Sequence, residues 1–200
     1  MARNENIERW LDGPVNGIPG LLQPVAHALL QAAKEVTRTM NDFPEALLWQ
    51  ELAGMASPGF HLQHMAGVLD RLFTYARGEM LTEEQMAYLK AEGKPPESPY
   101  VLPVLEDAVA FSEDVLEMLG ENSAQSNMLV NHLRQRVNLC LQQLAAVDPG
   151  SLTEFRGVGR KQAPSTVIGL FTHAAEHTMR HTGQLLVTTA VLKGSWKTVS

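Results

Sequence analysis

Apolar residues recur at intervals of three and four positions along several segments of the chain, which is the spacing typical of an amphipathic helix. The first such segment runs from Ile18 to about Met40. The second opens with Ser57, Pro58 and Gly59 and stops at Gly78. Proline in a first helical turn and glycine after a last turn are common helix boundaries. The pattern therefore predicts two long helices in this part of the chain.

The same helical spacing continues in the second half of the chain. It covers Val101–Leu119 and, after the loop GENSAQS, Met128–Val147. These two runs predict either two helices or one interrupted rod. A last run is introduced by Pro164 and Ser165 and continues to about Leu192, shortly before a glycine. We expect this last run to form one long helix.

The connections between these runs carry weaker signals. TEEQMAYLKAE predicts a short helix, because Thr82 followed by Gln85 has the spacing of a capping box, and GKPPESP ends it. TEFRGVGRKQ, residues 153–162, is interpreted as a polar connection whose glycines shape a tight loop. No run alternates apolar and polar residues as a strand would. The pattern thus predicts an all-α fold, a bundle of roughly four long helices with extra short helices in the connections.

Composition and charge narrow the possible partners. The 200 residues suit one compact domain that spans residues 1–200. A formal net charge of −6 argues against nucleic acid as a partner, because the surface repels polyanions. No apolar run approaches the roughly 18 to 20 residues that cross a bilayer, so no membrane partner is expected. The first residues lack a secretory signal and the single cysteine, Cys140, lies among apolar residues as a small core residue would, so we expect a cytoplasmic protein.

Histidines on two predicted helices are the candidate metal ligands. His177 and His181 lie four residues apart, so both can direct a nitrogen at one point on a helix face. His173 extends the series but is rotated by roughly 80° from His181, so the three do not easily bind one ion. A divalent ion needs a third protein ligand, which must come from another helix. His61 and His64 lie on the second predicted helix, and His64 is the better candidate because it lies beside the apolar face.

The alternative for each histidine is an ordinary hydrogen-bonded side chain, since the spacing HxxxH also occurs by chance. We favour this interpretation for His27, His132, His61 and His173 taken singly. The sequence also has no GxSxG elbow, CxxC pair or Walker loop, so it gives no support for a nucleophilic serine, dithiol redox chemistry or nucleotide hydrolysis.

The two histidine-bearing segments together are similar to a known family. SPGFHLQHMAGVLDRLFTYARG, residues 57–78, followed by HAAEHTMRHTGQLL, residues 173–186, resembles the DinB-like (DinB/YfiT) superfamily of metal-binding four-helix bundles. The resemblance extends from about residue 20 to 192 and implies an up-down-down-up bundle. Carried over residue by residue, it makes His64, His177 and His181 the metal ligands. The segment from Thr82 to Gln125 departs from the family pattern, and we expect substrate choice to depend on it.

The resemblance also implies an activity. Three neutral imidazoles leave positions open on a divalent ion, which activates a bound water or deprotonates a bound thiol. Family members resemble homodimeric thiol S-transferases and isomerases that use bacillithiol, mycothiol or glutathione. Our first hypothesis is therefore a homodimeric metal-dependent enzyme that transfers a low-molecular-weight thiol to a small electrophile through a metal-bound thiolate. The alternatives are a hydrolase that uses metal-bound hydroxide and a non-catalytic metal-binding bundle. Imidazole suits several metals; we expect zinc, with nickel or iron as alternatives.

Four further residues near the histidines are assigned by their spacing. Gln184 lies on the ligand face, where we expect it, like His61, to contact a ligand imidazole or the substrate pocket rather than the ion. Packing alone is the alternative for Gln184. Gly183 is expected to permit a close contact between helices. Glu176 and Arg180 are four residues apart and predict a solvated ion pair, which leaves the catalytic residues unassigned.

Overall fold

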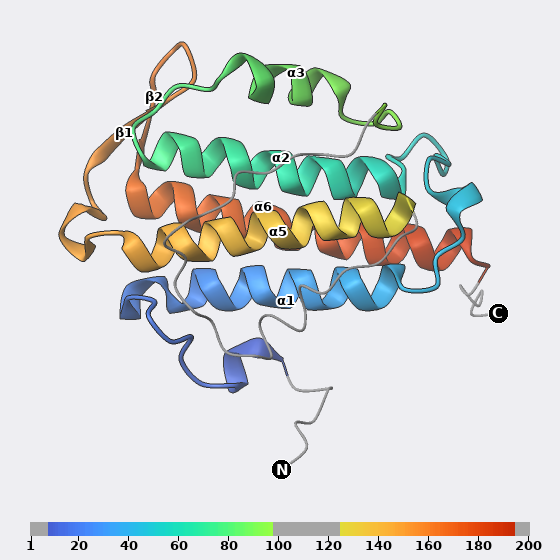
Figure 1. Cartoon of the computed structure of the whole chain (residues 1–200), viewed down its shortest axis with the longest axis horizontal. Coiled ribbons are helices and arrows are strands. Elements are labelled where there is room, and N and C mark those ends of the chain that lie inside the picture. The colour runs from blue at the N-terminus through green and yellow to red at the C-terminus, as the bar shows by residue number, and fades with distance from the viewer. Residues whose placement is uncertain (1–7, 98–124, 195–200) are drawn as a thin grey trace.

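The computed structural model describes residues 8–97 and 125–194 and is built mainly from helices (Figure 1). The long helices are α1 (Gln23–Met40), α2 (Pro58–Ala76), α5 (Gln125–Ala146) and α6 (Val167–Leu192), and α3 (Glu83–Ala91) is short. Short 3₁₀ turns lie in the connections, at Arg9–Leu11, Gly20–Leu22, Glu45–Leu47 and Pro149–Ser151. The predicted all-α fold class is confirmed. The helix predicted over Val101–Leu119 lies outside the described residues.

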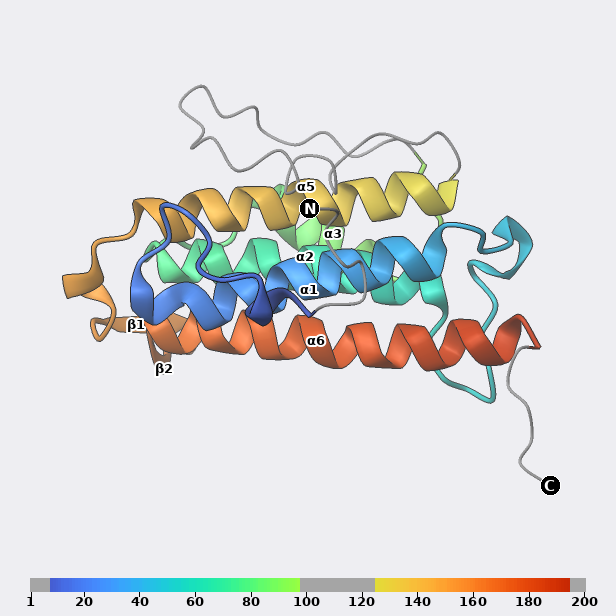
Figure 2. The ribbon, with the colours of Figure 1, turned by 90° about the horizontal axis from the view of Figure 1, so that it is seen from below.

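The four long helices pack side by side (Figures 1 and 2). Helices α1 and α2 each contact both α5 and α6, so α1 and α2 lie diagonally across the bundle from each other. In Figure 1, α1 and α6 run from left to right and α2 and α5 from right to left. Helix α3 lies against the outer side of α2. None of the described helices is long and apolar enough to cross a membrane.

Capping side chains explain where α2, α3 and α6 begin. Ser57 caps α2 by accepting a hydrogen bond from the Phe60 N–H at 3.2 Å. Thr82 and Gln85 form the predicted capping box at the start of α3. The cap of α6 is Thr166, which accepts a hydrogen bond from the Gly169 N–H at 3.1 Å. The last helix therefore begins at Val167, slightly later than the sequence predicts.

A short hairpin precedes α6, although the sequence pattern predicts a polar connection without strands. Strands β1 (Phe155–Val158) and β2 (Ala163–Thr166) pair antiparallel, with Phe155 opposite Thr166. Both strands are exposed or half-buried along their length, so they lack the alternation that marks a strand with one buried face. The turn uses a positive φ of 64° at Gly159, and Arg156 Nε donates to the Ala76 carbonyl at 2.9 Å. This bond ties the hairpin to the end of α2.

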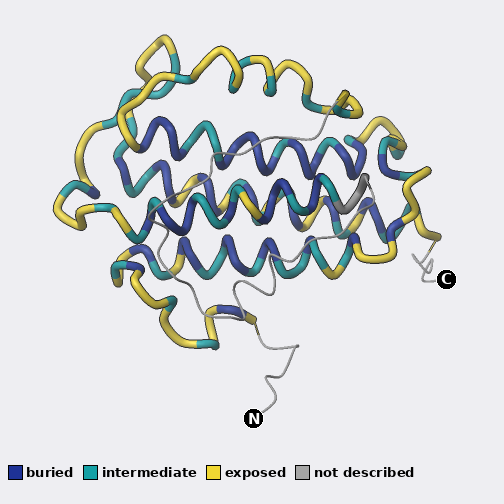
Figure 3. The backbone as a smooth tube through the Cα atoms, viewed as in Figure 1, coloured by how far each residue is buried: buried dark blue, intermediate teal, exposed yellow. Residues whose placement is uncertain are grey.

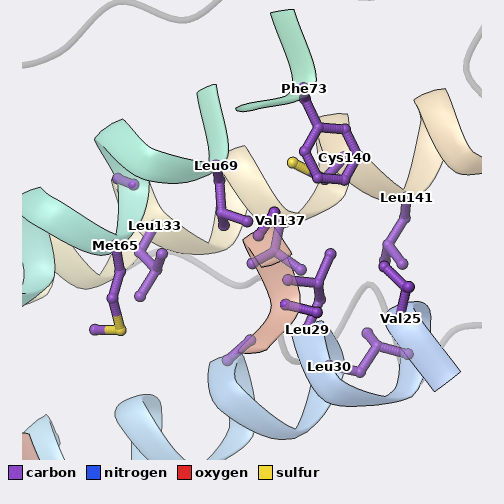
Figure 4. Close-up of a cluster of buried hydrophobic side chains, with 14 of the residues drawn as sticks. Val25, Leu29, Leu30, Met65, Leu69, Phe73, Leu133, Val137, Cys140 and Leu141 are labelled. Atoms are coloured by element: carbon purple, nitrogen blue, oxygen red, sulfur yellow. The ribbon is translucent and has the colours of Figure 1, made fainter. Parts of the chain in front are cut away.

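The core lies between the four long helices, whereas α3 and the hairpin are largely exposed (Figure 3). Figure 4 shows apolar side chains from α1, α2 and α5 meeting in this core. Each fully buried Leu, Phe or Met contributes about 1.5–3 kcal/mol of transfer free energy. Cys140 is buried among them as predicted, and burial raises the pKa of its thiol. The fully buried large side chains include Phe171, Leu22, Leu29, Met40, Leu48, Leu62, Met65, Leu69, Leu129, Leu133, Leu141 and Leu144.

Candidate metal centre

Helices α2 and α6 pack against each other and bring three histidines from distant parts of the chain together. His64 comes from α2, and His177 and His181 come from α6. One nitrogen of each ring lies within 4.8 Å of the others. The ring centroid of His181 is 4.5 Å from that of His64 and 4.7 Å from that of His177. The three residues that the resemblance indicates as ligands therefore form one cluster.

The spacing of the nitrogens suits a divalent ion. His64 Nε2 and His177 Nε2 are 3.0 Å apart, and only one proton can lie between two such atoms. Nitrogens that bind one tetrahedral zinc ion at about 2.0–2.1 Å lie about 3.3 Å from one another. Small side-chain rotations are enough to bring the three nitrogens to three corners of a coordination tetrahedron. Among the described residues, no further histidine, aspartate, glutamate or cysteine belongs to the cluster, so none supplies the fourth corner.

A buried carboxylate orients the His64 ring. His64 Nδ1–H donates to Glu92 Oε2 at 2.7 Å, which leaves Nε2 to face His177. The other oxygen, Glu92 Oε1, accepts from Arg71 Nη1 at 2.7 Å, and the Glu92 side chain is only 5% exposed. Phe60 stacks on a face of the His64 ring, with the two ring centroids 5.1 Å apart and the ring planes 12° from parallel. A carboxylate on the far nitrogen fixes the tautomer of a ligand histidine and strengthens it as a base.

The segment that carries Glu92 is held against α2 at two points. Gln63 accepts from the Gly93 N–H at 2.7 Å and donates to the Lys94 carbonyl at 2.8 Å. Gly67 provides the space for the ion pair, since a Cβ there would lie 2.6 Å from both Arg71 Nη1 and Glu92 Oε1. The residues around the ion pair therefore leave Glu92 little freedom to move away from His64.

His61 supports His181 in a similar way. The two Nδ1 atoms are 3.0 Å apart, so one donates a hydrogen bond to the other, and the Nε2 of His181 is free to hold an ion when His181 is the donor. His61 is 4% exposed, and its ring centroid is 5.3 Å from that of His181. His61 thus touches a candidate ligand rather than joining the cluster of three.

A sequence model of the DinB superfamily matches residues 27–185. The chain belongs to the DinB superfamily. The resemblance inferred from the two histidine-bearing segments is thereby confirmed. No curated protein matches the chain. The family match includes α2 and the histidines of α6, so the cluster lies wholly within the part of the chain that is shared with the DinB superfamily.

The surroundings of this DinB-superfamily cluster lower the pKa of His61, His177 and His181. Burial, followed by the neighbouring imidazoles, lowers the pKa of His181 to about 3. Burial and the nearby His64 lower the pKa of His61 to about 4, and the same two causes lower the pKa of His177. These rings are therefore neutral at pH 7. Neutral imidazole is the form that binds a metal ion.

The other residues singled out from the sequence lie around this cluster. His173 is exposed and has its Nδ1 3.4 Å from Glu176 Oε2, so it stays outside the cluster. Glu176 and Arg180 form the predicted exposed ion pair. Gly183 does not permit a close helix contact, because a Cβ there would meet nothing within 4 Å. That expectation is wrong because the glycine lies on the solvent side of α6.

A cleft of about 580 Å³ adjoins the cluster, and we call it the His181 cleft. The start of α2 and the loop before it form one side, and α6 forms the other. Gln184 is exposed and lines this cleft together with His61 and His181. Its side chain has no hydrogen bond to an imidazole in the described part of the chain. Of its two expected places, beside a ligand imidazole or in a substrate pocket, the second stays a prediction.

Sequence reasoning missed Glu92. The residue is the last one of the predicted short helix, directly follows α3 in the structure, and has no spacing relation to the histidines. The only available hint is that it precedes a glycine, whose φ of 87° turns the chain back toward α2. Gln63, next to His64, was also not singled out, although its 2% exposure marks it as a polar residue with a structural partner.

Another buried histidine makes the free energy of unfolding of the metal-free protein depend on pH. Burial, followed by the charge of Arg136, lowers the pKa of His132 on α5 to about 3. In the unfolded chain its pKa is about 6.5, so below this pH the unfolded state binds a proton that the folded state does not. The free energy of unfolding should therefore fall as the pH is lowered from 6.5 toward 3, by about 1 kcal/mol per pH unit for this histidine. Urea denaturation in the presence of a chelator measures it.

The His132→Leu variant removes this titration and is the comparison for that experiment. Its unfolding free energy should decline less steeply below pH 6.5 than that of the unchanged protein. An identical slope in both proteins would contradict the assignment of the buried neutral form to His132.

Proposed function

We propose that this protein is a divalent-metal-dependent enzyme that transfers a low-molecular-weight thiol to an electrophilic small molecule. The proposal is carried by the cluster of His64, His177 and His181, whose candidate ligand nitrogens lie within 4.8 Å of one another. A divalent ion held by three imidazoles keeps positions open at which a thiol loses its proton and becomes a nucleophile at neutral pH. The chain's own thiol is unsuited to this role, because burial raises the pKa of Cys140.

The residues around the cluster would each have a defined task. His64 and His181 would hold the ion through Nε2, because Glu92 and His61 engage their Nδ1 atoms. Phe60 covers one face of the His64 ring and limits the access of water there. In the reaction, a carbon–sulfur bond forms, the thiol proton passes to solvent, and the bond from the electrophilic carbon to its leaving group breaks.

Thiol transfer is favoured over hydrolysis by the state of the nearby carboxylates. Hydrolysis by a metal-activated water usually employs a general base beside the ion. Glu92 is committed to His64 and Arg71, and Glu176 is exposed and paired with Arg180. Among the described residues, these two carboxylates are the ones joined to the histidines by hydrogen bonds or ion pairs. Neither is placed as an unpaired base.

A product analysis tests the proposal. The protein is purified without a histidine tag, freed of metal and reloaded with zinc, nickel or iron(II). Each form is then incubated with glutathione, bacillithiol or mycothiol and with chlorodinitrobenzene, an epoxide or a carboxylic ester. We expect mass spectrometry to detect a thiol conjugate whose formation needs both metal and thiol.

The alternatives give different results in the same experiment. Ester cleavage that proceeds without thiol would replace transfer by hydrolysis. A metal that raises the melting temperature without any product would identify a non-catalytic bundle. The homodimer that the resemblance implies stays a prediction, which light scattering on the purified protein tests.

A further inference from the structure

The His181 cleft has the size and position of a small-molecule site. Its volume of about 580 Å³ lies within the range of about 300–1,000 Å³ that is usual for ligand pockets. It is bounded by His61 and His181, and thus reaches the edge of the histidine cluster. A molecule in the cleft would lie beside the one candidate ligand that the cleft exposes.

The lining of the cleft is mainly apolar. Met55 and Val187 are 49% and 50% exposed, which is unusual for large apolar side chains, and Phe60 also lines the cleft. Arg180 is the only lining residue that carries a permanent charge, and no carboxylate of the described residues lines the cleft. Its Nη2 donates to Glu176, which leaves further N–H groups of the guanidinium for another acceptor. This lining suits an apolar body with an uncharged or anionic end and disfavours a cation.

Gly183 keeps the cleft open. It lies in the middle of α6, although glycine is the poorest helix former apart from proline. A Cβ at this position would meet nothing within 4 Å, so neither packing nor a positive φ requires glycine. The missing side chain instead leaves room along the part of the cleft that α6 lines, next to Val187 one turn further on. A larger residue at 183 would occupy that room while the helix backbone stays as it is.

We propose that the His181 cleft binds the acceptor substrate, and that this substrate is an apolar aryl or alkyl compound with an anionic or hydrogen-bond-accepting end near Arg180. The apolar body lies between Met55 and Val187, and the part of the molecule nearest His181 is the part that reacts. Its meaning for catalysis rests on the proposed function, whereas binding in the cleft does not require the metal.

Two fluorescent probes of nearly the same shape test this inference. Anilinonaphthalene sulfonate has an apolar body and one negative charge, and N-phenyl-1-naphthylamine lacks the charge. We expect both to bind the folded protein with one site per chain. Gly183→Leu should weaken both probes by about tenfold or more, since even one misplaced methylene in an apolar pocket costs about 10- to 200-fold. Gly183→Ala should bind them nearly as well as the unchanged protein and have a higher melting temperature.

Charge and position are separated by further variants. Arg180→Gln should weaken the sulfonate probe by about two- to fivefold and leave the neutral probe unchanged, because an exposed ion pair contributes little. Val187→Phe enlarges a lining residue one turn further along α6 and serves as the blocking variant if Gly183→Leu does not fold. The His64→Ala variant should keep both probes, and Gly183→Leu should keep the zinc affinity of the unchanged protein.

These measurements distinguish failure of the cleft from failure of the metal site. Unaltered binding of both probes to folded Gly183→Leu and Val187→Phe would overturn the inference. So would many weak sites per chain, which would show adsorption to exposed apolar surface. If the unchanged protein failed to bind zinc but still bound the probes, the proposed function would be refuted and the cleft would remain a binding site.

Discussion

Replacing His64 by alanine is expected to lower the affinity for zinc by about 100-fold or more. Structural zinc sites with four protein ligands have apparent binding free energies of about 10–16 kcal/mol, or about 3 kcal/mol per ligand. Each 1.4 kcal/mol is a factor of about ten in affinity. Two histidines on one helix remain in the variant, and such a pair alone does not close a site. Competition with a chromogenic chelator measures the dissociation constant.

The control for this experiment is His173→Ala. His173 lies on the same helix, one turn before His177, but it is exposed and outside the cluster. Its loss should leave the zinc affinity within about twofold, because it contributes only an exposed contact with Glu176. If His64→Ala bound zinc as tightly as His173→Ala, the ligand assignment would be wrong. Circular dichroism of both variants shows whether the bundle is intact.

Replacing Glu92 by alanine is expected to weaken zinc binding by about 10- to 100-fold, although Glu92 is not in the cluster of candidate ligands. Without the carboxylate, His64 Nδ1–H loses its acceptor and the ring is free to turn away from His177. Arg71 would also lose its partner and place an unpaired charge beside the ligand. Glu92→Gln keeps an acceptor oxygen and should therefore fall between alanine and the unchanged protein.

Two further variants make the role of Glu92 specific. Gly67→Ala leaves every polar residue in place but introduces a Cβ where the Arg71–Glu92 ion pair now lies, so it should weaken zinc binding in the same direction. Glu176→Gln removes an exposed carboxylate near His177 and should change the zinc affinity by less than about twofold. Equal affinities of Glu92→Ala and Glu176→Gln would show that Glu92 has only a structural role.

The sequence predicts the parts of this structure that repeat along a helix. The apolar spacing locates α1, α2 and α5, and the spacing of His177 and His181 identifies the side of α6 that faces His64. These features are local, because a residue's face is set by its position relative to its neighbours. His64 is preferred to His61 because it lies beside the apolar face, and the family resemblance implies the same ligand.

The features that escaped prediction depend on contacts between distant segments. Glu92 reaches His64 across 28 positions, and its position is set by how the segment after α3 folds back on Gln63. The hairpin before α6 is stabilised by its turn and by the bond from Arg156 to Ala76, and neither has a periodic signature. Gly183 was misinterpreted because a sequence does not show which side of a helix is left without a neighbour.

The position of Glu92 just after α3 links the interior of the bundle to its periphery. Ion binding and docking of the Glu92 segment against α2 are two coupled equilibria, and such coupling is reciprocal. If docking of Glu92 makes ion binding more favourable, a bound ion makes docking of Glu92 more favourable by the same free energy. Binding of an ion at the proposed centre would therefore stabilise the turn after α3, and fraying of that turn would favour release of the ion. Substitutions on the exposed side of α3 provide a means of tuning metal retention that leaves all three imidazoles untouched.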